Sequence, residues 1–542
     1  MFLLFLEDVM RTLKEFADPR LIRESEHADL STTVAFRIAK EKNLRPEDVA
    51  KSIVENIEPQ GYVGSVESVG GYINFFANYE FLSDTVENIL SDQNYGRLNL
   101  KGKVLIEHTS ANPDGPLHIG HVRNAVIGDT LARMFKKAGF DVTTHYYIND
   151  MGRQMAITVL GVEKFGLSNK KPDHAIAEAY ISANRMLEEK KELEKEVEKL
   201  MLEYEQGNEE VVWKFRKAIE IAMEGIKETL RRLNVFHDEF LWESEFVRDR
   251  SVDNVLNLLD SKGLIKKDGA WIVEFEDLKE VVLRRENGTS LYVTRDLAYH
   301  LWKSQKFERI VNVWGADHKL YGEQLRRLLQ ILGIKIPEIV FFEFVSLPEG
   351  RMSTRKGRFV SADELIEKVK EEVKKLISNR ELSKEEIDDI AEAVAIGAIR
   401  FDFLKVAPEK PMVFDMKKAI DFERQTASYI QYTHSRACSI LRKCEEGGSF
   451  RAELCNKSER DLVILLSKMP LYVKRVVEEL KPNLFAEYLL SVASKFNEFY
   501  RDYPVLKAEK EVREHRIAIV KAVRNVLRNG LELMGIKALE RM

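Results

Sequence analysis

The fold of this chain is best inferred from Lys103-Val104-Leu105-Ile106-Glu107-His108-Thr109-Ser110-Ala111-Asn112-Pro113-Asp114-Gly115-Pro116-Leu117-His118-Ile119-Gly120-His121. The apolar run 104–106 predicts a short strand buried in a parallel sheet. Proline and glycine within 113–116 predict a turn. A helical pattern then begins at His118, and its apolar face is formed by Val122, Val126, Leu131 and Phe135. The stretch therefore predicts a strand, a loop and the start of a helix.

Two imidazoles, those of His118 and His121, lie in the first turn of this predicted helix, with Gly120 between them. Backbone N–H groups at a helix N-terminus already favour anions. Histidines can add donors to phosphate oxygens, and a glycine lets a flat base or a ribose approach. Taken alone, the pair is explained equally well by a nucleotide site and by a surface helix that carries two histidines.

The longer string 107–124, which ends in Gly120-His121-Val122-Arg123-Asn124, resembles the signature of arginyl-tRNA synthetases, a family of class I aminoacyl-tRNA synthetases. The core His-Ile-Gly-His is only moderately specific, because other nucleotidyltransferases carry similar motifs, but the longer string is specific. The resemblance runs from the N-terminus to Met542. It implies an α/β fold with a Rossmann-like parallel-sheet catalytic domain, an N-terminal α/β domain and an all-helical C-terminal anticodon-binding domain.

Length and composition limit the number of domains and the kinds of partner that this chain can have. A chain of 542 residues is too long for one compact core, so three or four domains are expected. The net charge of −5 means that any RNA-binding surface must be a local basic patch. Three cysteines without Cys-x-x-Cys spacing indicate free thiols in a reducing cytosol. The apolar start 1–6 ends at Glu7, so we expect it to be the buried face of a helix in a cytoplasmic protein, with no signal peptide or membrane span.

Six segments are predicted along the chain. They are an N-terminal domain over 1–100, the first half of the nucleotide fold over 101–160, a helical insertion over 161–235, the second half over 236–345, a signature-loop and stem-contact region over 346–410, and a helical domain over 411–542. The insertion is inferred from an apolar stripe at helical spacing that runs from Phe215 to Leu233. Before it, Asn149-Asp150-Met151-Gly152-Arg153-Gln154 is predicted to be a polar turn that caps the next helix.

A strand is predicted over 72–76 in the N-terminal domain. Alternation places Tyr72 and Asn74 on one face and Ile73 on the other. A Tyr–Asn face could stack on and read an unpaired RNA base, and an ordinary half-buried strand explains the pattern as well. In the family this domain touches the D-loop of the tRNA, so the resemblance makes Tyr72 and Asn74 candidate RNA contacts.

Acidic and polar residues are predicted at the ends of several strands. Besides 104–106, strands are predicted over 142–148, 271–275, 309–314 and 339–345, and 290–296 is predicted to be a strand running into a helix. In an open parallel sheet, ligands lie beyond the carboxyl ends of the strands. Glu107, Asp296 and the pair Asp317-His318 are all predicted at such ends. The sequence contains no Gly-x-Gly-x-x-Gly fingerprint or P-loop, which argues against a dinucleotide enzyme or a Walker-type NTPase.

The segment 350–358 is a basic loop bounded by glycines, and such a loop can clamp a triphosphate. A solvated basic loop is the alternative. The segment resembles the second class I signature, Lys-Met-Ser-Lys-Ser, but Arg351 stands at its first lysine and Thr354 at its second. This departure leaves Lys356 as the first candidate for the pyrophosphate contact, Arg355 as the second and Arg351 as the third.

From about residue 411 the chain is predicted to be almost wholly helical, and most aromatic residues there are expected in the core. The arrangement resembles the helical anticodon-binding domain of the arginyl enzymes. By that resemblance Tyr432, Tyr500 and Met542 are candidate contacts to the anticodon loop.

The resemblance implies a ligase that activates L-arginine with ATP to arginyl-adenylate and transfers arginine to the 3′ end of tRNA(Arg), releasing AMP and pyrophosphate. ATP is expected to enter with Mg²⁺, with no tightly bound metal or organic cofactor, and a monomer is expected. Neither step needs a protein nucleophile, so catalysis is positioning and charge stabilisation. The implied roles are catalysis by His118, His121, Lys356 and Arg355; ATP binding by His118, Ile119, Gly120, His121, Met352, Ser353 and Lys356; and arginine binding by Glu107, Ser110, Asn112, Tyr292, Asp296, Asp317 and His318.

The predicted arginine pocket needs acceptors for a planar cation with five donors. Glu107 and Asp296 offer two carboxylates, and the ring of Tyr292 can pack against the guanidinium. The structural alternatives are a helix cap for Asp296 and a surface position at a strand end for Glu107.

Two other functions remain open from the sequence. One is a class I synthetase for another amino acid or a small nucleotidyltransferase, although the long helical C-terminal part argues against the latter. The other is a non-catalytic tRNA-binding relative, which the chemically intact signature loops argue against.

Overall fold

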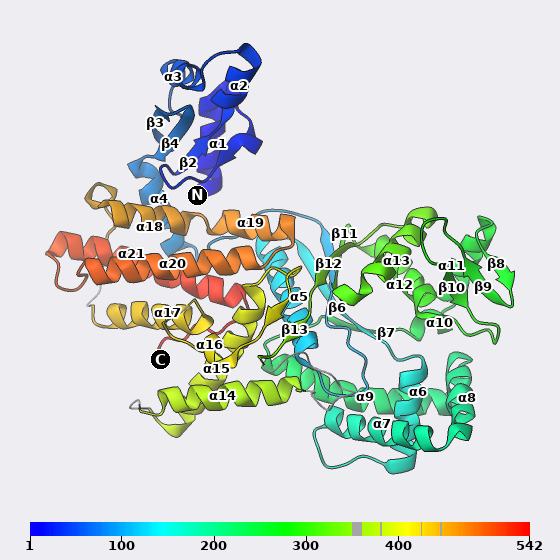
Figure 1. The fold of residues 1–542 in the computed structure, drawn as a ribbon. Helices are drawn as coiled ribbons and strands as arrows, with labels where there is room; N and C mark the ends of the chain where they lie inside the picture. Colours follow the sequence, from blue (N-terminus) through cyan, green and yellow to red (C-terminus); the bar gives the residue numbers. More distant parts are fainter. Residues whose placement is uncertain (349–359, 380–381, 424, 445–446) are drawn as a thin grey trace.

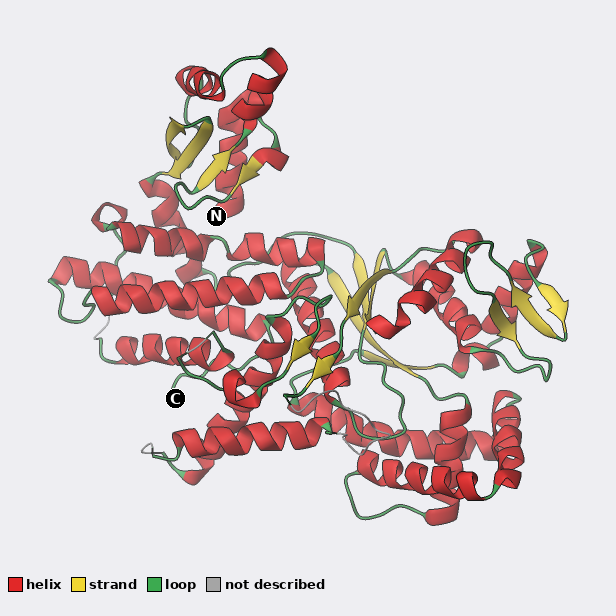
Figure 2. Cartoon of the chain, in the orientation of Figure 1, coloured by secondary structure: helices red, strands yellow, loops and turns green. Residues whose placement is uncertain are grey.

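The structure is a computed structural model that describes residues 1–348, 360–379, 382–423, 425–444 and 447–542. At its centre lies a five-stranded parallel sheet with the strand order β12-β11-β5-β6-β7 (Figure 1; Figure 2). Its strands are β5 (Lys103–Glu107), β6 (Asp141–Ile148), β7 (Glu239–Trp242), β11 (Arg309–Gly315) and β12 (Glu338–Phe342). The strand predicted over 104–106 is thus the middle strand of the sheet.

Helix α5 (Ile119–Ala138) follows β5 and packs against β5, β6 and β11. The apolar residues predicted for its inner face are buried, which confirms the strand–loop–helix prediction. The second half of the fold adds a separate hydrophobic core between helices and a small antiparallel sheet. Its elements are α10 (Glu245–Arg248), α11 (Ser251–Ser261), α12 (Tyr292–Lys306), α13 (Lys319–Leu332), β8 (Lys266–Asp268), β9 (Ala270–Val273) and β10 (Val281–Arg284).

The segment between β6 and β7 is helical from Arg153 to Arg232, and it includes most of the range 161–235 predicted as an insertion. Its long last helix buries the apolar stripe that begins at Phe215. The insertion lies apart from the N-terminal part of the chain, beside the carboxyl ends of the central strands (Figure 1). Its helices are α6 (Arg153–Phe165), α7 (Pro172–Glu189), α8 (Glu194–Glu205) and α9 (Glu209–Arg232).

The N-terminal module is an antiparallel sheet with the strand order β1-β2-β4-β3 and four helices. The apolar start of the chain is the buried face of its first helix, because Phe2 and Phe5 are fully buried. The elements are α1 (Phe2–Leu13), α2 (Val34–Lys42), α3 (Pro46–Asn56), α4 (Tyr79–Ser91), β1 (Ile22–Arg23), β2 (Leu30–Thr32), β3 (Val63–Val69) and β4 (Tyr72–Ala77).

Among its described residues, the C-terminal part is mainly helical and contains one short strand pair, β13 (Val345–Ser346) with β14 (Met412–Val413). Within the described residues no helix is both long and apolar enough to cross a bilayer. The helices are α14 (Ala362–Ile377), α15 (Lys384–Leu404), α16 (Met416–Ala419), α17 (Ala427–Arg442), α18 (Lys457–Ser467), α19 (Met469–Glu479), α20 (Asn483–Asp502) and α21 (Lys510–Leu533).

Arginine side chains join these parts at two places, among other contacts. The guanidinium of Arg400, fully buried in α15, pairs with Asp129 of α5 and donates to the carbonyl oxygens of Leu233, at 2.8 Å, and Met534, at 2.7 Å. At the other end of the molecule, Arg460 of α18 pairs with Asp29 of the N-terminal module, with 3.0 Å between Nη1 and Oδ1. The N-terminal module therefore rests on the C-terminal helices (Figure 1).

Two strand predictions were wrong in part. Residues 290–296 were expected to be a strand running into a helix, but the helix α12 begins already at Tyr292. The Thr294 hydroxyl donates to the carbonyl of Leu283, and this tertiary contact outweighs the local β propensity. The run 339–345 is divided between β12 and β13.

Candidate active site

An open cleft of about 1810 Å³ lies beyond the carboxyl ends of the central strands, between the sheet, the insertion and the start of α14. Ten residues predicted to bind ATP or arginine line it, although they come from segments far apart in the sequence. They are Glu107, Ser110, Asn112, His118, Gly120, His121, Tyr292, Asp296, Asp317 and His318. Ile119 is fully buried and its side chain is absent from the lining, so its predicted ATP contact could involve only its backbone.

The two signature histidines are locked to the start of α5. His118 is the N-cap, and its Nδ1 accepts the N–H groups of Gly120 at 3.0 Å and His121 at 3.3 Å. Nδ1 of His121 in turn accepts the N–H of His118 at 3.4 Å, and the two rings stack with 3.6 Å between their centroids. The side chain of His118 thus occupies two of the N–H groups that had been expected to bind an anion. A Cβ at position 120 would lie 2.8 Å from the His118 ring, so the glycine makes this cap possible.

Burial lowers the pKa of both rings, and the charge of His118 adds to the effect on His121. Both imidazoles are therefore neutral near pH 7. Because each Nδ1 accepts a backbone N–H, the proton of each neutral ring resides on Nε2. Each histidine can thus present an N–H donor to an anionic ligand without carrying a charge.

The loop between β5 and α5 is held in an uncommon backbone conformation. Thr109 and Ser110 have φ values of 68° and 39°, a region that non-glycine residues rarely adopt. The side-chain amide of Asn124 accepts the N–H of Thr109 at 2.7 Å and stabilises this turn. The Ser110 hydroxyl accepts the N–H of Tyr147 at 3.0 Å, and Nδ2 of Asn149 donates to Asn112 at 3.1 Å. These bonds place polar groups at the floor of the cleft.

Glu107 has a cation partner within the protein, which the sequence did not reveal. Its carboxylate pairs with the ammonium of Lys303 in α12, and both side chains are buried. Its other oxygen faces the Ser110 hydroxyl at 3.4 Å. No spacing in the sequence indicates this partner, because it lies 196 residues along the chain.

Asp296 lies in the second turn of α12, where the prediction of a strand end was wrong. Its carboxylate accepts the hydroxyl of Tyr321 from α13, and it forms no ion pair within the described residues. Burial is the main cause that raises the pKa of Asp296 to about 7; the Tyr321 hydrogen bond opposes it, and the negative charges of Glu107 and Glu243 add to it. A cationic group placed here would favour the ionised carboxylate and complete its hydrogen bonding.

Two further groups of the cleft were missed by sequence reasoning. Glu243 directly follows β7, is buried, and pairs with Arg295 at 2.8 Å. Burial raises the pKa of Glu243, and Arg295 opposes this rise. The strand-end signal that identified Glu107 would have identified Glu243 had β7 been predicted. The Tyr147 hydroxyl is also buried in the lining, without a hydrogen-bond partner in the described residues, and no sequence signal identified it.

The exposed members of the site lie at the mouth of the cleft. Tyr292 is 56% exposed, and its ring lies 5.1 Å from that of Tyr321. Asp317 and His318, in the short 3₁₀ turn after β11, are also exposed. Tyr292 is thus free to pack against a ligand that reaches Asp296.

Asp150 has a different role from the one predicted. The N-cap of α6 is Gly152, which has no side chain, whereas Asp150 is fully buried and accepts the hydroxyl of Tyr204 and the N–H of Ser244, the latter at 2.9 Å. Asp150 therefore joins the insertion to the end of β7 instead of capping a helix.

The predicted residues outside the cleft are placed as follows. Arg351, Met352, Ser353, Arg355 and Lys356 lie outside the described residues. In the N-terminal module Tyr72 is 48% exposed but Asn74 only 7%, because β4 is paired on both sides. Only Tyr72 of this pair offers a surface to RNA.

Two of the residues predicted to contact the anticodon loop, Tyr432 and Tyr500, lie beside the guanidinium of Arg436. The guanidinium of Arg436 lies 4.9 Å from the ring centroid of Tyr432 and 5.4 Å from that of Tyr500. The last residues of the chain run along the same helix, since Ser435 donates to the carbonyl of Glu540 at 3.2 Å. Met542, two residues further on, is partly buried.

Three family profiles match successive parts of the chain. They are described as arginyl tRNA synthetase N terminal domain over 6–77, tRNA synthetases class I (R), catalytic domain over 85–416, and DALR anticodon binding domain over 430–542. Among curated proteins, the arginine--tRNA ligase of Archaeoglobus fulgidus is 67% identical and that of Methanothrix thermoacetophila 46%, each covering 100% of both chains.

Solved structures of arginyl-tRNA synthetases have the same fold as this chain. Thermus thermophilus arginyl-tRNA synthetase superposes with a TM-score of 0.87 at 28% identity and covers 99% of each chain. The Plasmodium falciparum enzyme, at 19% identity and a TM-score of 0.81, covers 100% of this chain and 98% of its own and shows the same fold. With a catalytic profile over more than half of its length and full-length relatives of high identity, the chain belongs to the arginyl-tRNA synthetase family.

Proposed function

We infer that this chain is a ligase that activates L-arginine with ATP and transfers the arginyl group to tRNA. The carboxylate of arginine attacks the α-phosphorus of ATP, the bond to the β-phosphate oxygen breaks, and pyrophosphate leaves. The terminal ribose hydroxyl of the tRNA then attacks the carbonyl of the adenylate, and AMP leaves. ATP enters as its magnesium complex, and the protein contributes positioning and charge stabilisation.

The observation that carries this proposal is the carboxyl of Asp296. It lies in the cleft with a pKa raised to about 7, a hydroxyl from Tyr321, and no internal cation among the described residues. A guanidinium that binds there gains a charged acceptor and lowers the pKa of that acceptor. Glu107, which already pairs with Lys303, is assigned a supporting role in the lining of the pocket.

The rest of the arginine site is proposed from the same cleft. Tyr292 packs its exposed ring against the guanidinium stem. Ser110 and Asn112, held by the strained turn after β5, face the α-amino and carboxylate groups, together with the Asp317-His318 turn. Neutral Nε2–H groups of His118 and His121 donate to phosphate oxygens of ATP as negative charge develops there.

For tRNA we propose contacts at Tyr72 and at the cluster of Tyr432, Arg436 and Tyr500. Aromatic rings beside a guanidinium suit stacking on unpaired bases and pairing with phosphates. We further propose that tRNA(Arg) is the partner and that the chain acts as a monomer in the cytoplasm, where ATP and uncharged tRNA are available. The signature loop 350–358, with Lys356 foremost, is proposed to neutralise the leaving pyrophosphate.

ATP–pyrophosphate exchange with the purified full-length chain tests the function. We expect strong exchange with arginine, weak exchange with lysine and almost none with citrulline, measured both with and without tRNA. Lysine presents a point charge in place of a planar fork, and citrulline keeps the shape but loses the charge. Equal exchange with arginine and citrulline would contradict the assignment of Asp296.

A further inference from the structure

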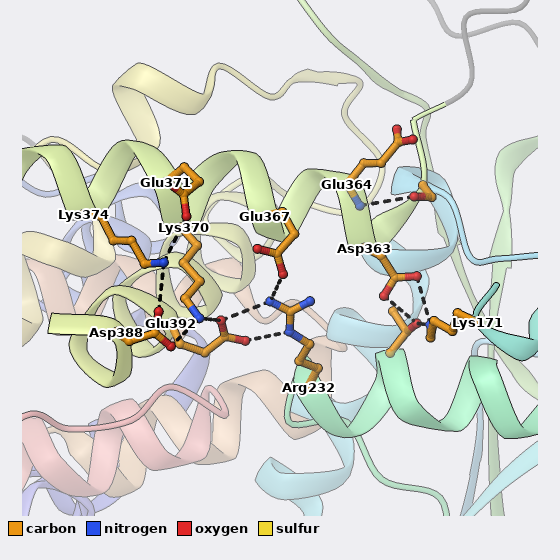
Figure 3. Close-up of polar contacts among 12 residues, drawn as sticks. Lys171, Arg232, Asp363, Glu364, Glu367, Lys370, Glu371, Lys374, Asp388 and Glu392 are labelled. Atoms are coloured by element: carbon orange, nitrogen blue, oxygen red, sulfur yellow. Dashed lines mark hydrogen bonds and ion pairs between the residues drawn. The ribbon is translucent and has the colours of Figure 1, made fainter. Parts of the chain in front are cut away.

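A network of charged side chains fixes α14 against three other helices (Figure 3). Near the middle of α14, Glu367 pairs at 2.6 Å with Arg232, the last residue of α9, and Arg232 pairs at 2.7 Å with Glu392 of α15. Further along, Lys370 and Lys374 both lie 2.8 Å from Asp388 of α15. The network thus extends along most of the helix.

The first turn of α14 has its own anchor in the insertion. The carboxylate of Asp363 pairs with the ammonium of Lys171 at 2.9 Å, and it accepts from Nε2 of His174 at 3.1 Å and the hydroxyl of Thr229 at 3.0 Å. Burial opposes ionisation of Asp363, but the bond and charge of Lys171, with His174 and Thr229, outweigh it and hold the pKa of this carboxyl below its usual value. One side chain of α14 therefore binds both α7, through its N-cap residue Lys171, and α9.

Lys171 acts as an internal cation in this cluster. Ligand atoms of Asp173, His174 and Asp363 lie within 4.8 Å of one another, close enough in principle to hold a metal ion. The ammonium of Lys171, however, lies 3.2 Å from Asp173 and 2.9 Å from Asp363, between the two carboxylates. A divalent cation would have to displace this ammonium, so we assign the cluster to structural pairing.

The residues just before Asp363 are joined to the first signature. Ala362 donates its N–H to the carbonyl of Leu117 at 2.7 Å, and Ser361 forms an antiparallel bridge with His118. Ser361 is buried and is also the N-cap of α14, accepting the N–H of Glu364 at 3.2 Å. The backbone that carries His118 is therefore paired with a segment whose next side chain is tied to the insertion.

We propose that Asp363 is a positioning residue for ATP in the activation step, acting with Lys171. The pair fixes Ser361 and Ala362 relative to α7 and α9, and these residues fix the backbone of Leu117 and His118. Through these contacts the insertion contributes to the geometry of the ATP site. This inference rests on the proposed function, because it assigns His118 to the phosphates of ATP.

The test is the ATP dependence of exchange at saturating arginine and tRNA, with active sites counted by the burst of adenylate formation. Asp363→Asn is expected to lower kcat/KM for ATP about tenfold or more, since small displacements of positioning groups have effects of this size. The KM for arginine is expected to stay within about twofold of wild type. Asp363→Glu should restore much of the loss, Lys171→Met should reproduce it, and the double variant should add little to either single change.

Asp388→Asn is the matched control, because it removes an acceptor of the same network at the far end of α14. It should lower the melting temperature less than Asp363→Asn does, because the Asp388 side chain is 48% exposed, and it should leave the ATP kinetics unchanged. Wild-type ATP kinetics in Asp363→Asn, or an equal loss in Asp388→Asn, would overturn the proposal. Failure of the wild-type chain to exchange with arginine would instead overturn the proposed function, so the two results are distinguishable.

Discussion

At the scale of single residues, each signature histidine caps the first turn of α5, and the same ring is proposed to donate to phosphate. Nδ1 of each imidazole holds the first turn of α5, which leaves Nε2–H as the group that can reach phosphate. Removing one ring therefore removes a donor and a cap together. The two effects differ in size, because a helix cap contributes about 1 kcal/mol to stability whereas loss of a transition-state donor slows a reaction by about 100-fold or more.

We accordingly expect His121→Ala to slow adenylate formation by about 100-fold or more, with a loss of about 1 kcal/mol in the free energy of unfolding. Pre-steady-state adenylate formation and urea denaturation measure the two effects. The exposed His27 provides the control, since His27→Ala should change neither. Full activity in His121→Ala would show that this ring is only a cap.

The carboxyl of Asp296 predicts a pH dependence of arginine binding. With a pKa of about 7 it is half protonated at neutral pH in the free protein, whereas the guanidinium needs the ionised form. The association constant for arginine should reach its maximum above pH 7, where Asp296 is ionised, and should fall about tenfold for each pH unit below pH 7. Titration calorimetry between pH 5.5 and about 8.5 measures this slope.

Stability should follow the opposite course in the free protein. The native pKa of Asp296 lies above its unfolded value of about 3.9, so the native state binds the proton more tightly. The contribution of this group is present at low pH and is lost as the pH rises through about 7. Saturating arginine should remove that loss. In Asp296→Asn both pH dependences should disappear, and a binding curve that still falls below pH 7 would assign the titration to another group.

At the scale of elements, sequence patterns predicted the helices and strands that depend mainly on interactions between residues close in sequence. The strand β5, the turn after it and the apolar face of α5 follow from residue order alone, because the neighbours in sequence are the neighbours in space. The end of β7 and the start of α12 could not be found in this way. Val293 and Thr294 favour a strand, yet the contact of Thr294 with Leu283 and the pairing of Arg295 with Glu243 place them in a helix.

Ion-pair partners that lie far apart in the sequence could not be predicted either. Glu107 was identified as part of the site from its position at a strand end, and it does line the cleft. That Lys303 already neutralises it depends on packing between β5 and α12, which no spacing in the sequence reveals. Asp296, whose cation partner is proposed to be the substrate, looks the same in sequence as Glu107.

The junction at Arg400 gives a prediction for element packing. Its guanidinium binds α5, the end of α9 and the end of α21 at once, and a lysine cannot supply donors in three directions from one plane. Arg400→Lys should lower the free energy of unfolding by about 3–5 kcal/mol, as for a broken buried pair. Arg133→Lys is the matched control, since Arg133 pairs with the same Asp129 at 2.8 Å but is partly exposed. We expect a change below about 1 kcal/mol there, and equal effects would contradict the assignment.

At the scale of the whole molecule, the C-terminal helices are a poor candidate for deletion. Helix α19 packs on α5, and Arg400 of α15 donates to the carbonyl of Met534 at 2.7 Å. A chain that ended near residue 410 would expose this interface, so loss of tRNA binding in it would not identify a binding surface. Substitutions on the surface are the better test.

Arg436→Ala and Tyr500→Ala should each weaken tRNA binding, together by about tenfold or more, because they remove a stacking ring and a cation that share one site. Filter binding at two salt concentrations measures this, and the salt slope should fall in Arg436→Ala as one phosphate contact is lost. Arg475→Ala, which removes a similar arginine from the ring of Tyr472, is the control and should bind tRNA normally. Unchanged affinity in Arg436→Ala would place the RNA surface elsewhere.

The ion pair between Asp29 and Arg460 has a consequence for the shape of the RNA that this protein can bind. It seats the N-terminal module on α18, so the span between Tyr72 and the Tyr432–Tyr500 cluster is set by folded protein and not by a linker. The distance between the two points is therefore fixed, and an RNA that contacts both must have a matching length and bend. With tRNA contacts proposed at both places, binding is expected to depend on the shape of the folded tRNA, and an isolated hairpin with the right bases would reach only one of them.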